Sequence, residues 1–389
     1  MKKKTPRQVY ILGLVSLFND ISSEMLYPIL PVFLTQVIGA PVYVLGIIEG
    51  FAEGSASFLK TYFGFLSDKL NKRKGFVFAG YFLSACSKLI IALSNLWGVV
   101  FAGRLTDKLG KGLRTGARDA MLLGYSDESN RGYIFGLHRS FDSAGAVVGP
   151  LIALLLLGIW NDSLRTIIFI AVIPGFIGLI LFSFVKEVTF EKSAKPIKFF
   201  ASIKTFPKNF KVLLTGLAIF SLGNSSDTFL ILKSKDIGLS ITMVIMAYII
   251  YNAVYSGFSV MAGKLADRVG KTKIFFWGLL IYAVVYIGFA LNTSFAGVFI
   301  LFFIYGFYIA MTDGIAKAIA GSLVQKEESG TAFGLMQTVI GLSTLLASII
   351  GGFLWSLVSP ESTFYFGAVC AAAAFVYLAV NFRPSPGKA

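Results

Sequence analysis

The sequence predicts an all-α membrane protein in which twelve transmembrane helices form two pseudo-symmetric six-helix bundles. The 389-residue chain is 56% hydrophobic and only 14% charged, whereas soluble domains average about 25% charged residues. Apolar runs of about 20 residues, long enough to cross a bilayer, follow one another along the chain. Motifs of the first half recur in the second half at a nearly constant spacing, which indicates a duplicated bundle.

Twelve runs are predicted to span the membrane. They cover residues 8–36, 42–66, 75–94, 97–123, 132–158, 164–185, 208–232, 240–263, 274–291, 295–321, 330–355 and 361–382. The first run is too long for a cleavable signal peptide and carries acids, so we expect it to stay as a span.

The fourth run is the most charged of the twelve. Its charged residues are Arg104, Asp107, Lys108, Lys111, Arg114, Arg118 and Asp119. At 100° per residue they fall within an arc of about 140° on a helix. Seven charges facing lipid would cost on the order of 20 kcal/mol, so we expect this face to look into the protein.

Basic residues between the runs sort to one side of the membrane. With twelve spans, that side receives the N-terminal lysines, the turns near residues 69–74 and 264–273, and a lysine-rich segment at 186–207. This asymmetry predicts a cell (inner) membrane protein with both termini in the cytoplasm. The predicted parts are an N-terminal bundle at 1–185, a cytoplasmic linker at 186–207 and a C-terminal bundle at 208–389.

Two serine-serine-acid triplets mark corresponding places in the halves: Ser22-Ser23-Glu24 and, 203 residues later, Ser225-Ser226-Asp227. An acid deep in a membrane helix costs about 2.5–3.5 kcal/mol, so it usually faces water or a partner. We expect Glu24 and Asp227 to line one wet cavity and to bind protons or a cationic group. The alternative is a cap that faces the cytoplasm or the exterior.

Other polar residues extend this cavity. Asp20 and Glu24 lie one turn apart, as do Glu49 and Glu53, so each pair shares one face of its helix. Crowded carboxylates of this kind can carry protons. The alternative is that these acids are counter-ions in a structural network, because six acids nearly balance eight bases in the first half. The tyrosines and asparagine near residue 251 favour either an amphiphilic solute or helix packing. The full set predicted for the proton-coupling or substrate cavity is Asp20, Glu24, Glu49, Glu53, Arg104, Asp107, Lys111, Arg114, Asp227, Tyr251, Asn252, Asp313 and Lys317.

Two turn motifs resemble the signature of the major facilitator superfamily. The first reads Gly64, Leu66, Asp68, Lys69 and Arg73, with Asn71 in place of a second glycine; the second reads Gly263, Leu265, Asp267, Arg268 and Gly270. The fifth run carries Gly145 and Gly149-Pro150, which resembles the antiporter signature of that superfamily, although Ala153-Leu154 replace its last two glycines. The resemblance covers the whole chain, and the charged string at 104–119 resembles a drug-efflux-like prokaryotic subgroup.

The resemblance implies a gating role for the turns and for the fifth helix. The predicted gating set is Gly64, Asp68, Arg73, Arg118, Arg139, Asp142, Gly145, Gly149, Pro150, Gly263, Asp267 and Arg268. An acid in such a turn can hold basic or helix-end groups in one conformation and release them in another. The alternative for the turns is a solvated loop whose bases only orient the helices.

We therefore predict a secondary transporter that exports a small organic solute in exchange for protons. The alternative on the same fold is a proton-coupled importer of a nutrient, organic anion or metal chelate such as a siderophore. No enzyme motif, phosphate-binding loop or metal-ligand spacing is present in the sequence, so an intramembrane enzyme or a receptor is disfavoured. We expect no cofactor, no metal, no nucleic acid and no ATPase subunit; the partners are the lipid bilayer and the solute, and the chain acts as a monomer.

Overall fold

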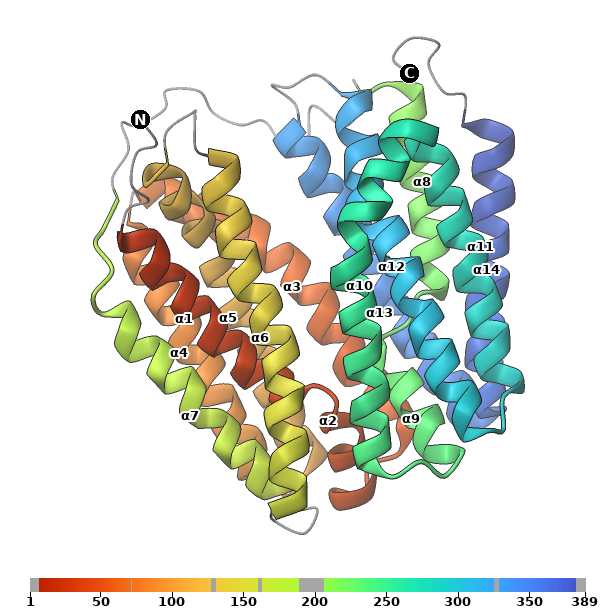
Figure 1. The fold of residues 1–389 in the computed structure, drawn as a ribbon, viewed down its shortest axis with the longest axis horizontal. Helices are drawn as coiled ribbons and strands as arrows, with labels where there is room; N and C mark the ends of the chain where they lie inside the picture. Colours follow the sequence, from red (N-terminus) through yellow and green to blue (C-terminus); the bar gives the residue numbers. More distant parts are fainter. Residues whose placement is uncertain are drawn as a thin grey trace. The chain divides into compact units, whose positions relative to one another are not determined.

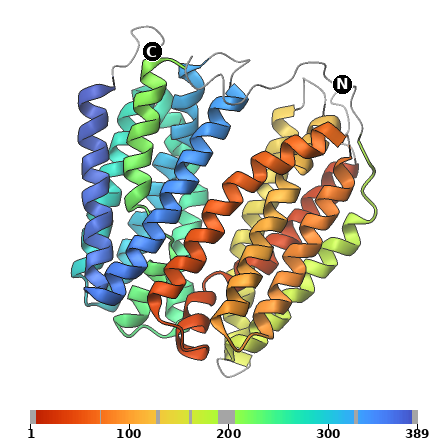
Figure 2. The ribbon, with the colours of Figure 1, turned by 180° about the vertical axis from the view of Figure 1, so that it is seen from behind.

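The chain is all-helical wherever the structure, a computed structural model, describes it (Figures 1 and 2). The described residues are 7–70, 72–126, 131–159, 163–188, 206–324 and 329–382. Most of the predicted linker, residues 189–205, lies outside these ranges.

The first half contains α1 (Arg7–Leu26), α2 (Leu30–Val32), the π-helix η1 (Phe33–Val37), α3 (Val42–Leu70), α4 (Arg73–Ala92), α5 (Trp97–Gly124), α6 (Arg131–Ile159) and α7 (Leu164–Phe182). The second half contains α8 (Lys208–Gly223), α9 (Thr228–Asp236), α10 (Ile241–Val269), α11 (Lys271–Leu291), α12 (Phe295–Leu323), α13 (Ser329–Leu357) and α14 (Pro360–Asn381).

Ten helical segments of the described chain are long and apolar enough to cross a bilayer. Two further spans bring the number to the predicted twelve. One is α5, whose charges lower its hydropathy but lie largely on the buried side. The other is the pair α8 and α9, each too short alone to span. The all-α membrane class is thereby confirmed.

The first and seventh spans are interrupted, which the sequence analysis did not predict. The first span stops at Leu26, passes through a turn that contains Pro28, and resumes as α2 and η1. Proline cannot donate the helical hydrogen bond, so it ends or kinks a helix. The seventh span stops at Gly223 and resumes at Thr228. Both interruptions fall at or next to the serine-serine-acid triplets.

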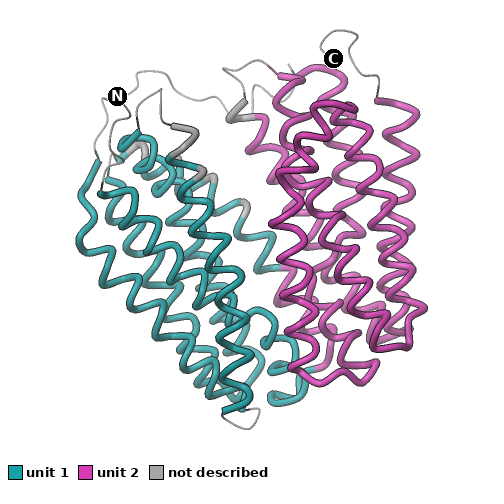
Figure 3. Tube along the Cα trace, viewed as in Figure 1, with its two compact units in different colours: residues 1–40, 51–194 teal, residues 41–50, 195–389 magenta. Residues whose placement is uncertain are grey.

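The chain divides into two compact units (Figure 3). The first comprises Met1–Ala40 and Phe51–Ala194, and the second comprises Pro41–Gly50 and Lys195–Ala389. The N-terminal end of α3 therefore groups with the helices of the second unit, where the main-chain amide of Tyr43 donates to Ser356 at 3.0 Å.

Each unit has its own buried core. In the first unit, α1 packs against α6 and α7, and α4 packs against α5 and α7. Its apolar core is built from Val9, Leu12, Val15, Val77, Tyr81, Ala117, Met121, Leu122, Ile134, Phe182 and Val185. In the second unit, α11 packs against both α12 and α14, and stacked or edge-on rings fill the space between them, including Tyr282, Tyr286, Phe289, Phe302 and Phe364.

Candidate functional site

Asp107 is the centre of a buried ion-pair cluster in the first unit. Its carboxylate accepts from Lys88 Nζ at 2.8 Å and from Ser84 Oγ at 2.9 Å, and Arg104 Nη1 lies 3.9 Å away. The side chain of Lys88 is only 1% exposed. Lys88 Nζ also donates to Ser23 Oγ at 3.0 Å, so the cluster is tied to the serine-serine-acid triplet of α1.

Three further bases of α5 have different kinds of partner. Lys108 makes a short ion pair with Glu53 of α3. Arg114 donates to Ser84 Oγ at 2.7 Å and lies 5.0 Å above the ring of Tyr81. Arg118 pairs with Asp119 at 3.0 Å and donates to Ser16 Oγ at 3.2 Å.

Glycines bring the charged faces of these helices together. A Cβ added at Gly110 of α5 would lie 2.5 Å from the carbonyl oxygen of Gly80 in α4. A Cβ added at Gly112 would lie 2.5 Å from Cβ of Leu59, and one at Gly116 would lie 2.9 Å from Cα of Gly64. These distances leave no room for a side chain, so α5 is in backbone contact with both α3 and α4.

The acids of α1 lie against the glycines of α6. A Cβ added at Gly145 would lie 2.8 Å from Cβ of Asp20, and one at Gly149 would lie 2.8 Å from Cβ of Glu24. Both pairs are spaced by four residues, so one turn of α6 matches one turn of α1. The structure thus places the antiporter-like motif directly on the helix that carries two predicted cavity acids.

Two further ion-pair contacts are local to α6, and Arg139 and Asp142 both belong to the predicted gating set. Arg139 Nη1 lies 4.0 Å from Asp142, and His138 Nδ1 lies 3.6 Å from the same carboxylate. The Arg139 side chain is 70% exposed, whereas His138 is buried. Pro150 lies inside α6, which continues through it to Ile159.

The first turn motif is anchored by a residue that the sequence analysis missed. The carboxylate of Glu187 accepts from the main-chain amides of Arg73 and Lys74 at 3.1 Å, and so caps the N-terminus of α4. Burial raises the pKa of the Tyr125 phenol to about 12, and the Glu187 carboxylate adds to this rise. The phenol therefore stays a neutral donor, and it donates to the carbonyl of Lys186. The side chain of Asp68 is outside the described part of the chain.

The second turn motif has a looser structure. Asp267 lies 3.9 Å from Lys271, and both side chains are largely exposed. Arg268 is exposed at the end of α10. Gly270 has φ of 110°, a conformation that glycine adopts without strain. This positive φ is the physical reason for a glycine at that position of the motif.

Asp227 is held by two phenols in the second unit. Tyr305 of α12 donates to Oδ1 at 2.6 Å, and Tyr251 of α10 donates to Oδ2 at 3.2 Å. Tyr305 was missed, although its place in an apolar run shortly before the recognised Asp313–Lys317 pair could have drawn attention to it. The predicted neighbour Asn252 instead donates to the carbonyl of Tyr248 in its own helix, at 3.0 Å.

Side chains from other helices satisfy the main chain at this interruption. The carbonyl of Gly223 accepts from the hydroxyl of Tyr282 at 2.8 Å, and the amide of Ser226 donates to Ser348 Oγ at 3.1 Å. Non-helical main chain at membrane depth requires such partners, because lipid supplies none. Asp227 thus occupies a stabilised break in the seventh span.

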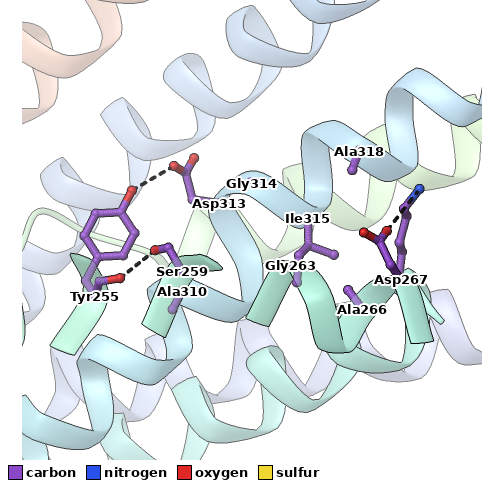
Figure 4. A pocket seen from close by; sticks show the side chains of 11 residues that line it. Tyr255, Ser259, Gly263, Ala266, Asp267, Ala310, Asp313, Gly314, Ile315 and Ala318 are labelled. Atoms are coloured by element: carbon purple, nitrogen blue, oxygen red, sulfur yellow. Dashed lines mark hydrogen bonds and ion pairs between the residues drawn. The ribbon is translucent and has the colours of Figure 1, made fainter. Parts of the chain in front are cut away.

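A hollow of about 330 Å³ lies between α10 and α12 of the second unit (Figure 4). Asp313 accepts from Lys317 at 2.9 Å and from Tyr255 at 3.2 Å at its edge. Gly263 and Asp267 of the second turn motif line it further along. The structure therefore brings a predicted cavity acid and part of the predicted gate to one hollow.

The predicted pair Glu49 and Glu53 is divided between the units, since residues 41–50 group with the second unit and Glu53 with the first. Glu24 and Asp227 likewise belong to different units, and their sharing of one cavity stays a prediction. Within the described residues, no three His, Cys, Asp or Glu side chains are arranged to hold a metal ion.

Comparison with known proteins identifies the family. The family model described as Major Facilitator Superfamily matches residues 12–233 and 212–389. An uncharacterized MFS-type transporter of Methanocaldococcus jannaschii, MJ1317, is 39% identical over 376 residues, covering 95% of this chain and 93% of that protein. The multi-drug resistance efflux pump PmrA of Streptococcus pneumoniae is 21% identical, covering 93% of this chain and 92% of the pump.

Solved structures share the fold at low identity. A mutant of the nucleoside transporter NupG has a TM-score of 0.82 at 12% identity, covering 97% of this chain and 100% of that one. A POT family transporter in complex with 5-aminolevulinic acid also scores 0.82 at 13% identity, covering 96% of both chains. The family match and the 39% identical MFS-type transporter indicate a transporter and not an enzyme. The chain belongs to the major facilitator superfamily and is a multi-pass secondary transporter of the membrane.

Proposed function

We propose that this transporter exports a small organic solute in exchange for protons, and that Asp227 carries the proton. The observation that supports this role is the pair of phenols on its carboxylate, at 2.6 and 3.2 Å. A hydroxyl can donate or accept. The same two phenols can therefore hold the carboxylate when it is charged and accept from it when it is protonated.

The surroundings of Asp227 favour repeated protonation. The break in the seventh span places the carboxylate one residue before the N-terminus of α9, where the helix dipole stabilises negative charge. The buried side chains of Tyr251 and Tyr305 contact it, so the loss or gain of one proton changes the local charge where the dielectric constant is below that of water. Glu24 is proposed as the corresponding acid of the first half.

Exchange rather than cotransport is supported by the packing of Gly145 and Gly149 against Asp20 and Glu24. In this proposal, movement of α6 along α1 changes the surroundings of both acids, which links the gate to protonation. The 21% identity to an efflux pump over most of the chain also favours export and the drug-efflux-like subgroup. The proposed setting is the cell membrane, with both termini in the cytoplasm.

A second candidate is a proton-coupled importer of an organic anion. The basic residues of α5, of which Lys108 and Arg114 are buried, favour an anionic solute. Both candidates use the same fold and the same proton carrier, so they differ only in the relative direction of protons and solute.

Proteoliposomes that enclose a pH-sensitive dye distinguish the two. Permanently charged solutes, quaternary ammonium and sulfonate compounds, are added outside, because they cannot carry protons through the lipid by themselves. Exchange makes the lumen more alkaline as solute enters, whereas cotransport makes it more acidic. Asp227→Asn should abolish the solute-dependent change, and Asp236→Asn, an exposed acid of the same helix α9, should keep it. Unchanged proton movement in Asp227→Asn would reject the assignment.

A further inference from the structure

Two lysines of the first unit take no part in the ion pairs described above. Lys60 lies on α3 and Lys111 on α5. Among the described residues, the ion pairs of this region join Lys88, Arg104, Lys108 and Arg118 to carboxylates, and neither Lys60 nor Lys111 makes one. Lys111 is exposed and Lys60 is half-buried, so a ligand can reach both amines.

These lysines belong to a group of four bases on two helices in contact. Lys108, Lys111 and Arg114 follow one another on α5 at intervals of three residues, and Lys60 lies on α3 between Leu59 and Gly64, which contact Gly112 and Gly116 of α5. Among the described residues, only Lys108 of these four bases makes an ion pair, so the group has more positive than negative charge when it is ionised. Glu53 is already engaged by Lys108.

The fold holds these like charges together. Gly112 and Gly116 of α5 contact Leu59 and Gly64 of α3, on either side of Lys60. The main chains of the two helices therefore cannot separate there without losing this contact. Arg114 is fixed as well, because it is 6% exposed, donates to Ser84 and lies over Tyr81.

We propose that Lys60, Lys108, Lys111 and Arg114, here called the basic cluster, bind the acidic group of the transported solute. The solute is then an organic anion with a carboxylate, sulfonate or phosphate group, which supplies the missing negative charge and accepts from the lysine amines. This inference rests on the proposed transport function and adds the chemical class of the cargo. It assigns cargo binding to the first half and proton binding to Asp227.

The test is equilibrium binding without any gradient, so it does not depend on proton coupling. Unfolding temperatures of the purified protein in uncharged detergent are measured against rising inorganic phosphate, citrate and m-benzenedisulfonate, at an ionic strength held constant with sodium chloride. We expect a saturable rise for at least one anion. Lys60→Gln and Lys111→Gln should each raise the half-saturating concentration by about tenfold or more, as expected for loss of a charge-assisted hydrogen bond, whereas Lys264→Gln, an exposed lysine of α10, should leave it nearly unchanged.

Folding of the variants is checked in the same experiment. Without anion, both variants should unfold at the same temperature as the wild-type protein or higher, because each removes a like charge from the basic cluster. The inference is overturned if no anion gives a saturable rise, or if the rise survives in both variants.

A lipid headgroup could supply the same phosphate chemistry. A second arm therefore adds phosphatidylglycerol to the micelles instead of a soluble anion. Stabilisation by this lipid alone, lost in Lys111→Gln, would make the basic cluster a lipid site and overturn the cargo assignment. Saturable binding of a soluble anion combined with failed proton exchange would instead reject only the proposed coupling.

Discussion

Removal of the Asp107 carboxylate should destabilise the protein far more than removal of the Asp313 carboxylate. The two acids share two kinds of contact: each accepts from a lysine, at 2.8 and 2.9 Å, and from a hydroxyl, at 2.9 and 3.2 Å. Asp107 also lies 3.9 Å from Arg104. They differ in exposure, because the Asp107 side chain is 12% exposed and that of Asp313 is 44% exposed.

This difference sets the expected magnitudes. Asp107→Ala leaves the buried cations of Lys88 and Arg104 without their shared carboxylate, which costs about 3–5 kcal/mol for a buried pair. Asp313→Ala removes an exposed pair worth about 0–1 kcal/mol. Ser84→Ala removes hydrogen bonds to Asp107 and Arg114 but leaves the ion pair of Lys88 and Asp107 in place. Hydrogen bonds between membrane helices average about 0.6 kcal/mol, so this variant should lose less stability than Asp107→Ala.

The assay is reversible unfolding in mixed micelles with rising dodecyl sulfate, followed by far-ultraviolet circular dichroism. The double variant Lys88→Met/Asp107→Leu should recover about half of the loss or more, because Lys88 no longer leaves a buried charge and Arg104 lies further from the carboxylate, at 3.9 Å. An Asp107→Ala variant no less stable than Asp313→Ala would refute the view that burial determines the strength of this cluster.

Three further variants test other contacts. Gly149→Ala should lower the free energy of unfolding by about 1–3 kcal/mol, because its Cβ meets Glu24 and the carbonyl of Ile21 at 2.8 Å. Gly158→Ala in the same helix meets nothing within 4 Å and should be neutral or stabilising by up to about 1 kcal/mol; equal losses would contradict the close packing. Tyr305→Phe should move the midpoint of the pH–flux curve upward, because the Asp227 carboxylate loses the donor that lies 2.6 Å away, whereas Tyr255→Phe should not; identical curves for both would count against the Asp227 assignment. Glu187→Gln should cost about 0.5–2 kcal/mol through loss of the α4 cap, with a smaller effect at high salt, and a salt-independent loss would argue against a charge effect.

The helix class and the inward face of α5 were predictable because they follow from composition and period. Seven charges on one arc of a helix can avoid lipid only by facing protein, and Arg104, Asp107, Lys108 and Arg114 are indeed buried. The acids Asp107 and Glu53 were also correctly expected to face bases. These conclusions need no knowledge of the neighbouring helices.

Tyr251, which donates to Asp227, was in the predicted cavity set, whereas Tyr305 did not follow from the same pattern. Tyr305 lies 78 residues away in an apolar run, and its hydroxyl can be identified as a donor to Asp227 only when α12 is placed beside the break. The break itself depends on Tyr282 and Ser348, which satisfy the main chain from two other helices. Periodicity reports which face of a helix is apolar, but it does not report which residue stands opposite.

The contact between Gly64 and Gly116 connects the first turn motif to the charged helix. Because the two main chains touch there, with 2.9 Å between Cα of Gly64 and a Cβ placed on Gly116, no flexible side chain lies between them to absorb a displacement. A tilt at the end of α3 must therefore be passed on to α5 as a rigid movement, which would carry Lys111 and Arg114 with it. A larger residue at Gly116 would loosen this linkage and separate the motion of the turn from that of the charges.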